Sequence, residues 1–261
     1  MNDIQKTLYI PLYGKAYVSR KGLFLQDQKA EEIWEREQFP LKGKSKSKWL
    51  AYYMGIRAAV FDAWVREQLA LHSDCILLHL GCGLDSRVVR AGDGKHPWYD
   101  VDFDAVIGER SRHFQENDRY HMIPGDLRSD AFLQPIPTQG RAVVVMEGVS
   151  MYLKTEELAW LLQALAKHFQ GVSLLMDCYT PLAARLSKIK NPIKDVGVHQ
   201  VYGVDAPEAL SCHGLSFRKE HDMTPPHFLS KLHGMEKTVF QHLYAGALPK
   251  KLYRLFEYTS E

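Results

Sequence analysis

The sequence predicts an α/β fold in which a mostly parallel sheet is doubly wound, with helices on both faces. From Cys75 onward, short apolar runs alternate with polar, helix-like stretches, a pattern typical of a parallel sheet. The first apolar run leads directly into a tight turn that contains Gly81 and Gly83 and opens a helix. Such a turn brings the backbone close to a ligand at the carboxyl end of a strand, which predicts a cofactor site.

The residues before the first strand, 1–72, are expected to form a helical cap over the sheet. Residues 30–36 form one amphipathic segment and residues 58–69 another. In the second segment, the apolar side chains recur at three-to-four spacing and form one stripe of a helix: Val60, Phe61, Trp64, Val65 and Leu69.

The next part, residues 73–180, is expected to be the cofactor-binding core. We expect its strands at residues 76–80, 98–101, 121–123, 142–146 and 172–176. Residues 155–169 should form a helix with Thr155 as its N-cap and Glu156 and Glu157 in its first turn.

The remaining residues, 181–261, are expected to supply a substrate-side insertion and the final strands. Residues 252–258 are expected to form a last strand at an edge of the sheet. The three parts together should make a single domain of 261 residues.

The composition is that of an ordinary globular protein. A formal net charge of +2 gives no general attraction to nucleic acid or to an anionic membrane. No segment has the pattern of a signal peptide or a membrane span, so we expect a cytoplasmic protein. The four cysteines include no Cys-x-x-Cys pair, and neither a disulfide framework nor a metal site is expected. The composition leaves the oligomeric state open.

One segment, residues 42–48, is biased in composition, with four lysines among glycine and serine residues. We expect a mobile, solvated loop, which is the usual behaviour of a charge run. The alternatives are a contact with a phosphate or an acidic substrate, and a lid that closes over a ligand.

The glycine turn departs from the dinucleotide-binding pattern at its third glycine. After Gly81 and Gly83, that pattern requires glycine or alanine where this chain has Ser86, flanked by Asp85 and Arg87. A charged pair at the mouth of the turn suits a ligand with hydroxyl groups and no phosphate. S-adenosylmethionine is such a ligand, and an NAD(P)-dependent oxidoreductase remains an alternative.

Acidic residues also follow the second and third strands. Asp102, about twenty positions beyond Gly83, can accept two hydrogen bonds from a ribose diol, although an Asp at this place can also cap a helix. We prefer Asp102 to Asp100 because it lies nearer the carboxyl end of the strand. In Gly125-Asp126-Leu127, the Asp can accept from an adenine amino group and the next backbone N–H can donate to the ring.

The fourth strand ends in a carboxylate and a glycine, Glu147 and Gly148. At the carboxyl end of a strand, the carboxylate or the neighbouring carbonyl can meet the ammonium group of a cofactor. The alternative is structural, with Glu147 as the buried partner of a local arginine.

Four motifs follow one another along the chain: Tyr53-x-Gly55-Ile56-Arg57 with Asp62, Leu80-Gly81-Cys82-Gly83-Leu84-Asp85-Ser86-Arg87, Trp98-Tyr99-Asp100-Val101-Asp102, and Glu147-Gly148-Val149-Ser150-Met151-Tyr152-Leu153. Together they resemble the leucine carboxyl methyltransferase family, and within it the bacterial branch that includes polyketide O-methyltransferases of the tetracenomycin type. The resemblance extends from about residue 12, through Tyr13-Gly14-Lys15-Ala16, to residue 205.

The resemblance implies a class I, Rossmann-like methyltransferase fold with a seven-stranded sheet, S-adenosylmethionine as donor and S-adenosylhomocysteine as product. It implies that Arg57 binds the methionine carboxylate, as a guanidinium fork suits. The other implied cofactor residues are Gly81, Cys82 and Gly83 at the turn, Asp102 and Phe103 at the ribose, Asp126 and Leu127 at the adenine, and Glu147 and Gly148 at the amino end.

The chain departs from the family pattern at three places. His79 stands where an amide is usual, Cys82 replaces alanine, and Phe103-Asp104 replaces leucine-proline. We interpret Cys82 as a small residue rather than a reactive thiol, and His79 as a hydrogen-bonded core residue rather than a base.

The expected reaction is O-methylation of a small, polyketide-like molecule at a carboxylate or a phenolic hydroxyl. A phenol requires a general base, whereas a carboxylate is already ionised at neutral pH. The candidate bases are His113, His199 and His227, and Tyr13 and Tyr152 can orient a carboxylate. A non-catalytic protein that binds S-adenosylmethionine and a partner is the second alternative.

Overall fold

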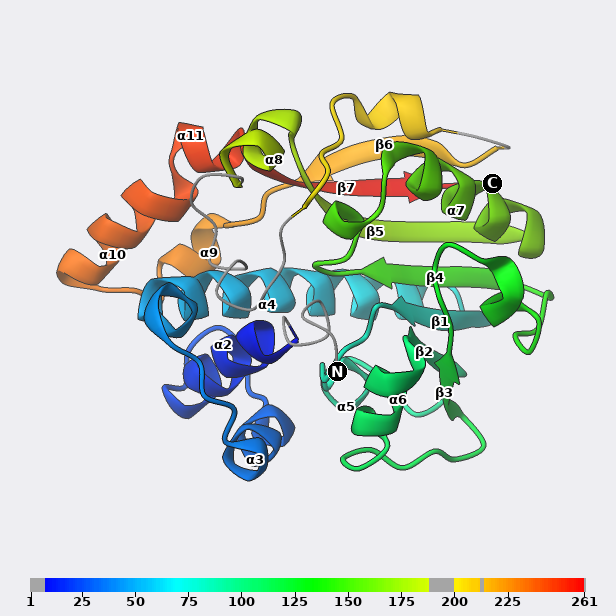
Figure 1. The fold of residues 1–261 in the computed structure, drawn as a ribbon, viewed down its shortest axis with the longest axis horizontal. Coiled ribbons are helices and arrows are strands. Elements are labelled where there is room, and N and C mark those ends of the chain that lie inside the picture. Colours follow the sequence, from blue (N-terminus) through cyan, green and yellow to red (C-terminus); the bar gives the residue numbers. More distant parts are fainter. Residues whose placement is uncertain (1–7, 188–199, 212–213, 261) are drawn as a thin grey trace.

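The computed structural model describes residues 8–187, 200–211 and 214–260, and its centre is a seven-stranded sheet (Figure 1). The strand order is β3-β2-β1-β4-β5-β7-β6. The first five strands are parallel, and β7 is antiparallel to both of its neighbours. The strands are β1 (Cys75–Leu80), β2 (Trp98–Asp102), β3 (Tyr120–Pro124), β4 (Arg141–Met146), β5 (Gly171–Tyr179), β6 (Ser216–His221) and β7 (Tyr253–Thr259).

Helices lie against both faces of this sheet. The longer helices of the protein are α2 (Tyr9–Arg20), α3 (Gln28–Glu37), α4 (Lys48–Leu71) and α7 (Thr155–His168). The shorter ones are α5 (Arg87–Arg90), α6 (Asp104–Arg110), α8 (Pro181–Ser187), α9 (Pro226–Leu229), α10 (Gly234–Phe240) and α11 (Ala247–Lys250). Short 3-10 or π segments are η1 (Gly43–Lys46), η2 (Asp130–Leu133), η3 (Ser150–Tyr152), η5 (Pro207–Leu210) and η6 (Gln241–Ala245).

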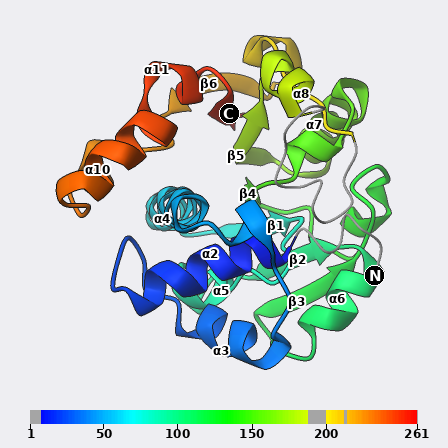
Figure 2. The ribbon, with the colours of Figure 1, turned by 60° about the vertical axis from the view of Figure 1, so that its left-hand side comes forward.

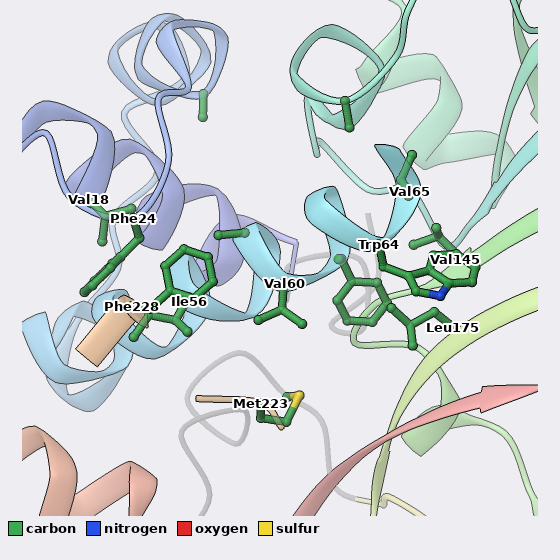
Figure 3. Packing of buried hydrophobic residues seen from close by; sticks show 14 of the residues in the cluster. Val18, Phe24, Ile56, Val60, Trp64, Val65, Val145, Leu175, Met223 and Phe228 are labelled. Atoms are coloured by element: carbon green, nitrogen blue, oxygen red, sulfur yellow. The ribbon is translucent and has the colours of Figure 1, made fainter. Parts of the chain in front are cut away.

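The side chains of the central strands alternate between the two faces, as the period of two requires. On β4, Val143 and Val145 join one buried cluster with residues of α4, including Trp64 and Val65 (Figure 3). Val144 joins a second cluster on the other face, with α7 residues Leu158, Leu161, Leu162 and Leu165. The predicted doubly wound, mostly parallel α/β fold is thereby confirmed.

The N-terminal region is helical, as expected. The predicted helix at residues 58–69 is the second half of α4, which begins at Lys48, where the Ser47 side chain accepts a hydrogen bond from the Trp49 N–H. This helix packs against one face of the sheet and is buried around most of its circumference. Figure 2 shows α2 and α3 on one side of α4 and α10 on the other.

Residues 42–48 are more ordered than a solvated loop. Residues Gly43–Lys46 form the 3-10 helix η1, in which Ser45 is buried. Lys42, Lys44 and Lys46 are exposed, as expected of a charge run. The positive φ of Gly43 allows the chain to turn into this helix.

Two predictions at strand and helix ends are wrong. The last strand, β7, is not an edge strand, because it lies between β5 and β6. The edge strand β6 has mostly exposed side chains and lacks the apolar run by which we recognised the others. In α7 the N-cap is Lys154, whose N–H donates to Glu157 Oε2 at 2.8 Å, so Thr155 is the first helical residue.

Strands β6 and β7 belong to the same sheet as the core strands, although they come from the C-terminal part of the chain. The division of the chain into one domain with three parts stays a prediction. Within the described ranges, no helix combines the length and the apolar character needed to cross a membrane.

Candidate active site

A cavity of about 560 Å³ opens at the carboxyl ends of strands β1 to β4. This is where ligands bind in open α/β sheets. All ten residues that the sequence indicates as cofactor ligands line it: Arg57, Gly81, Cys82, Gly83, Asp102, Phe103, Asp126, Leu127, Glu147 and Gly148. These residues come from α4, from the loops after four different strands, and from the end of β2 itself. The fold therefore brings the predicted set together.

The glycine turn after β1 requires residues without a side chain. Gly81 has φ +67°, and a Cβ atom placed there would lie 2.2 Å from Cγ2 of Val149. Gly148 has φ +72°, and its Cβ would lie 3.3 Å from a terminal nitrogen of Arg57. Both glycines allow the loops after β1 and β4 to approach closely over the cavity.

The carboxylate of Asp102 accepts hydrogen bonds from two backbone groups, the Gly83 N–H and the Phe103 N–H, each at 2.8 Å. Burial raises the pKa of Asp102 to about 6, although these two hydrogen bonds act in the opposite direction. Asp100 is instead fully buried and ion-paired with Arg110 at 2.5 Å, and it does not line the cavity.

The guanidinium of Arg57 is buried and has three partners. Its Nε and one terminal nitrogen contact Glu147 Oε1 at 3.0 and 2.9 Å. The other terminal nitrogen donates to Asp177 Oδ2 at 3.0 Å and to the Tyr253 hydroxyl at 2.7 Å. Burial disfavours its charge, but the neighbouring acidic groups hold the pKa of Arg57 above its usual range. Arg57 is therefore a fixed cation at the wall of the cavity.

Glu147 lies among three cations. Besides Arg57, it accepts a short hydrogen bond from Arg87, and Lys15 Nζ lies 3.7 Å from Oε1. These cations hold the pKa of Glu147 well below its usual range despite complete burial. Its contacts match the alternative of a buried partner of a local arginine, and it also lines the cavity.

Lys15 is a cavity residue to which the sequence analysis assigned no role. Its side chain is 3% exposed, and Nζ donates to Asp85 Oδ2 at 2.7 Å. The motif Tyr13-Gly14-Lys15-Ala16 contains it, but sequence alone does not distinguish a buried lysine from a solvated one. Lys15 is buried because its helix, α2, packs against α4.

The charged residues beside the glycine turn do not stand free at its mouth. Asp85 is paired with Lys15 and with Arg90, and Arg87 is fully buried against Asp62 at 2.8 Å and against Glu147. The expectation that this pair faces a ligand is wrong for Arg87, which does not line the cavity. Both residues belong to a buried ion network because unpaired charges are costly inside a protein.

Asp126 and Leu127 follow β3, which lies at one edge of the sheet, and both line the cavity. Asp126 is partly exposed and pairs with Arg128 at 2.5 Å, which lowers its pKa. Leu127 is buried in the cluster on the α7 face.

The cavity wall contributed by α4, β5 and the C-terminal elements is rich in aromatic and apolar side chains. The Tyr53 ring stacks on Tyr244 with centroids 5.1 Å apart, and Tyr179 meets Tyr253 edge-on at 5.0 Å. Further lining residues of this wall are Met54, Met151, Tyr152, Leu186, Leu243 and Leu252. Such a surface fits a flat apolar molecule.

The acceptor-side candidates are only partly brought to the cavity. Tyr152 lines it. Tyr13 does not, because α2 directs its ring toward Tyr17 and Trp34. His199 lies outside the described residues.

The candidate bases among the described histidines also lie elsewhere. His113 contacts Glu37 and Glu109, and His227 is exposed on α9, so neither lines the cavity. His79 does line it, but burial lowers its pKa, and its ring lies between Asp100 and Arg87. Burial raises the pKa of the Cys82 thiol, consistent with a small packing residue.

Comparison with known proteins gives the family. The model of the leucine carboxyl methyltransferase family matches residues 5–166. The tetracenomycin polyketide synthesis O-methyltransferase TcmP of Streptomyces glaucescens is 28% identical over 263 residues, covering 99% of this chain and 97% of that protein. An S-adenosyl-L-methionine-dependent methyltransferase of Gibberella zeae is 26% identical, covering 84% and 82%.

Solved structures agree on the fold. A DUF574 family protein from Streptomyces avermitilis has a TM-score of 0.59 with 10% identity, and the match covers 90% of this chain and 89% of that one. Magnesium protoporphyrin IX methyltransferase from Synechocystis, crystallised with S-adenosylhomocysteine, has a TM-score of 0.53 with 13% identity, covering 95% and 97%. The fold is that of class I methyltransferases, and this chain belongs to the leucine carboxyl methyltransferase family.

Proposed function

We propose that this protein transfers the methyl group of S-adenosylmethionine to an oxygen of a small, flat, polyketide-like molecule. The observation that carries the proposal is that one cavity is lined both by all the residues that the family resemblance assigns to the cofactor and by a tyrosine-rich wall. The name of the relative TcmP, an O-methyltransferase of polyketide synthesis, supports this class of acceptor.

In this proposal, the methionine carboxylate of the donor binds Arg57 and Lys15, the two buried cations of the cavity wall. Asp102 accepts from the ribose hydroxyls, and the loop of Asp126 and Leu127 meets the adenine. The amino end of the donor meets Glu147 or the neighbouring carbonyl. Each assignment matches a charge or a hydrogen-bonding group with the opposite one on the donor.

The tyrosine-rich wall is proposed to hold the acceptor. Methyl transfer from a sulfonium needs an in-line nucleophile in a dry, oriented pocket, and positioning supplies much of the acceleration. The rings of Tyr53 and Tyr179 can pack against an aromatic acceptor, whereas the Tyr253 hydroxyl is already hydrogen-bonded to Arg57 and Asp177. Both a carboxylate and a phenol remain candidates for the accepting oxygen.

Two measurements test the proposal. Calorimetry should detect one S-adenosylhomocysteine per chain and no binding of nicotinamide dinucleotides. Methyl transfer from labelled donor to a panel of aromatic acids and phenols of polyketide type should give an alkali-labile ester or a stable ether, which identifies the accepting oxygen.

Several outcomes would contradict the proposal. Binding of a nicotinamide dinucleotide without binding of S-adenosylhomocysteine would favour the oxidoreductase alternative, which the family match already disfavours. Donor binding without turnover on any member of a broad panel would favour the non-catalytic alternative. Variants that enlarge a side chain of the aromatic wall and so narrow the cavity, such as Tyr244→Trp, should change the preference for the acceptor more than the affinity for the donor.

A further inference from the structure

A cluster of metal-ligating side chains lies outside the cavity, where the N-terminal helices meet the sheet domain. Glu37 is the last residue of α3, Glu109 belongs to α6, and His113 follows α6 by three residues. One ligand atom from each residue lies within 4.8 Å of the other two. We infer that Glu37, Glu109 and His113 form a binding site for a divalent transition-metal ion, with zinc as the best fit.

The distances between the ligand atoms suit tetrahedral coordination. His113 Nε2 lies 3.2 Å from Glu37 Oε1 and 3.7 Å from Glu109 Oε1. With metal–ligand bonds of about 2.0–2.1 Å, a tetrahedral zinc site places its ligand atoms about 3.3 Å apart. The side chains therefore already stand near the separation that zinc requires.

Two of these atoms are buried without a hydrogen bond among the described residues. They are His113 Nε2 and Glu37 Oε1, and the His113 side chain is only 2% exposed. The two atoms face each other at 3.2 Å without forming a hydrogen bond, and buried polar atoms that form none require an explanation. A metal ion between the imidazole and the two carboxylates would satisfy both atoms.

The side chains of the cluster are of the types that bind zinc. Glu37 and Glu109 bring two carboxylates and His113 an imidazole, and both groups are ordinary zinc ligands. Arg112 is a neighbouring cation that contacts both carboxylates.

Arg112 competes with the metal in this proposal. It donates to both oxygens of Glu109, at 2.7 and 2.9 Å, and lies 3.6 Å from Glu37 Oε1, although its side chain is 51% exposed. A metal ion must displace this arginine from the carboxylates, so removing the arginine should favour metal binding. The sequence predicts no metal here because Glu109 follows Glu37 by 72 positions, and only the fold brings the two residues together.

Zinc titration into the EDTA-dialysed full chain tests the inference, independently of methyl transfer. We expect one zinc ion per chain with micromolar or tighter affinity and a higher Tm in its presence. His113→Gln and Glu37→Gln should each weaken zinc binding by about tenfold or more. His227→Gln, which changes an exposed histidine outside the cluster, should leave it unchanged. Arg112→Gln should bind zinc at least as tightly as the wild type.

Three results would overturn the inference: no zinc binding by the wild-type protein, equal binding by the wild type and His113→Gln, or loss of binding in Arg112→Gln. Circular dichroism establishes that each variant is folded. Because two ligand variants are compared, misfolding of one leaves the other as the test.

Discussion

The proposed position of the donor's ribose depends on the carboxylate of Asp102. Two backbone N–H groups hold it at the cavity wall. Asp102→Ala should weaken the binding of S-adenosylhomocysteine by about 1–3 kcal/mol, because hydrogen bonds to a charged group are lost. Isothermal titration calorimetry measures the change. Asp104→Ala, at an exposed acid two residues further on, is the matched control, and equal affinity in wild type and Asp102→Ala would place the ribose elsewhere.

The raised pKa of Asp102 also predicts a pH dependence. The pKa of about 6 means that the carboxylate is almost fully ionised at pH 7.5 and mostly protonated at pH 5.5. Because only the ionised form accepts two hydroxyl hydrogen bonds, affinity for S-adenosylhomocysteine should fall by about fourfold between these pH values, in proportion to the ionised fraction. Asp102→Asn should flatten this part of the profile. A wild-type profile that is flat from pH 5.5 to 7.5 would contradict the assignment.

At the scale of single residues, a position at the end of a strand predicted correctly which residues line the cavity. Asp102, Glu147 and Gly148 were placed from strand ends alone, and all line the cavity. The sequence predicted poorly which helical residues line the cavity, because that depends on which side of the helix faces it. Tyr13 and Lys15 are two positions apart on α2, yet only Lys15 reaches the cavity.

At the scale of elements, the turn after β1 gives a test of close packing. Gly81→Ala combines a left-handed backbone with a clash against Val149, so it should cost about 2–5 kcal/mol in the free energy of unfolding. Urea denaturation measures this cost, and binding of S-adenosylhomocysteine should be lost with it.

Gly94→Ala is the matched control for this variant. Gly94 has a nearly identical φ of +69°, but nothing lies within 4 Å of the added Cβ. It should cost only about 1–2 kcal/mol and leave ligand binding intact. Equal costs for the two variants would show that backbone strain, and not the approach of Val149, explains the glycine at position 81.

Among the elements, the buried parallel strands were predictable and the edge strand was not. The strands β1, β4 and β5 are apolar runs because helices cover both faces. Strand β6 is mostly exposed and has the sequence Ser-Phe-Arg-Lys-Glu-His, so hydrophobic pattern gives no signal for it. For the same reason, β7 was mistaken for an edge strand.

At the scale of the whole molecule, a buried ion network ties the N-terminal helices to the sheet. Arg90 is 4% exposed and contacts Asp27, Asp62 and Asp85, which come from three different segments. Arg90→Ala should destabilise the fold by about 3–5 kcal/mol, because it leaves buried carboxylates without a partner.

The comparison variant is Arg20→Ala, which removes a surface ion pair between α2 and α3. Arg20 is 41% exposed, and its loss should cost no more than about 1 kcal/mol. Chemical denaturation of both variants gives the two values. A small effect of Arg90→Ala would contradict this expectation and would mean that water or other side chains replace the arginine as partner of the carboxylates.

The place of β7 between β5 and β6 has a consequence for synthesis on the ribosome. Residues 253–259 must emerge before β5 can gain its second neighbour, so the nascent chain carries an open row of backbone donors and acceptors along β5 until then. Tyr253, at the start of this strand, also completes the surroundings of Arg57. If the first five strands fold before residues 253–259 are available, the free edge of β5 can pair with a strand of another chain, so expression of a chain truncated before residue 253 should give aggregates.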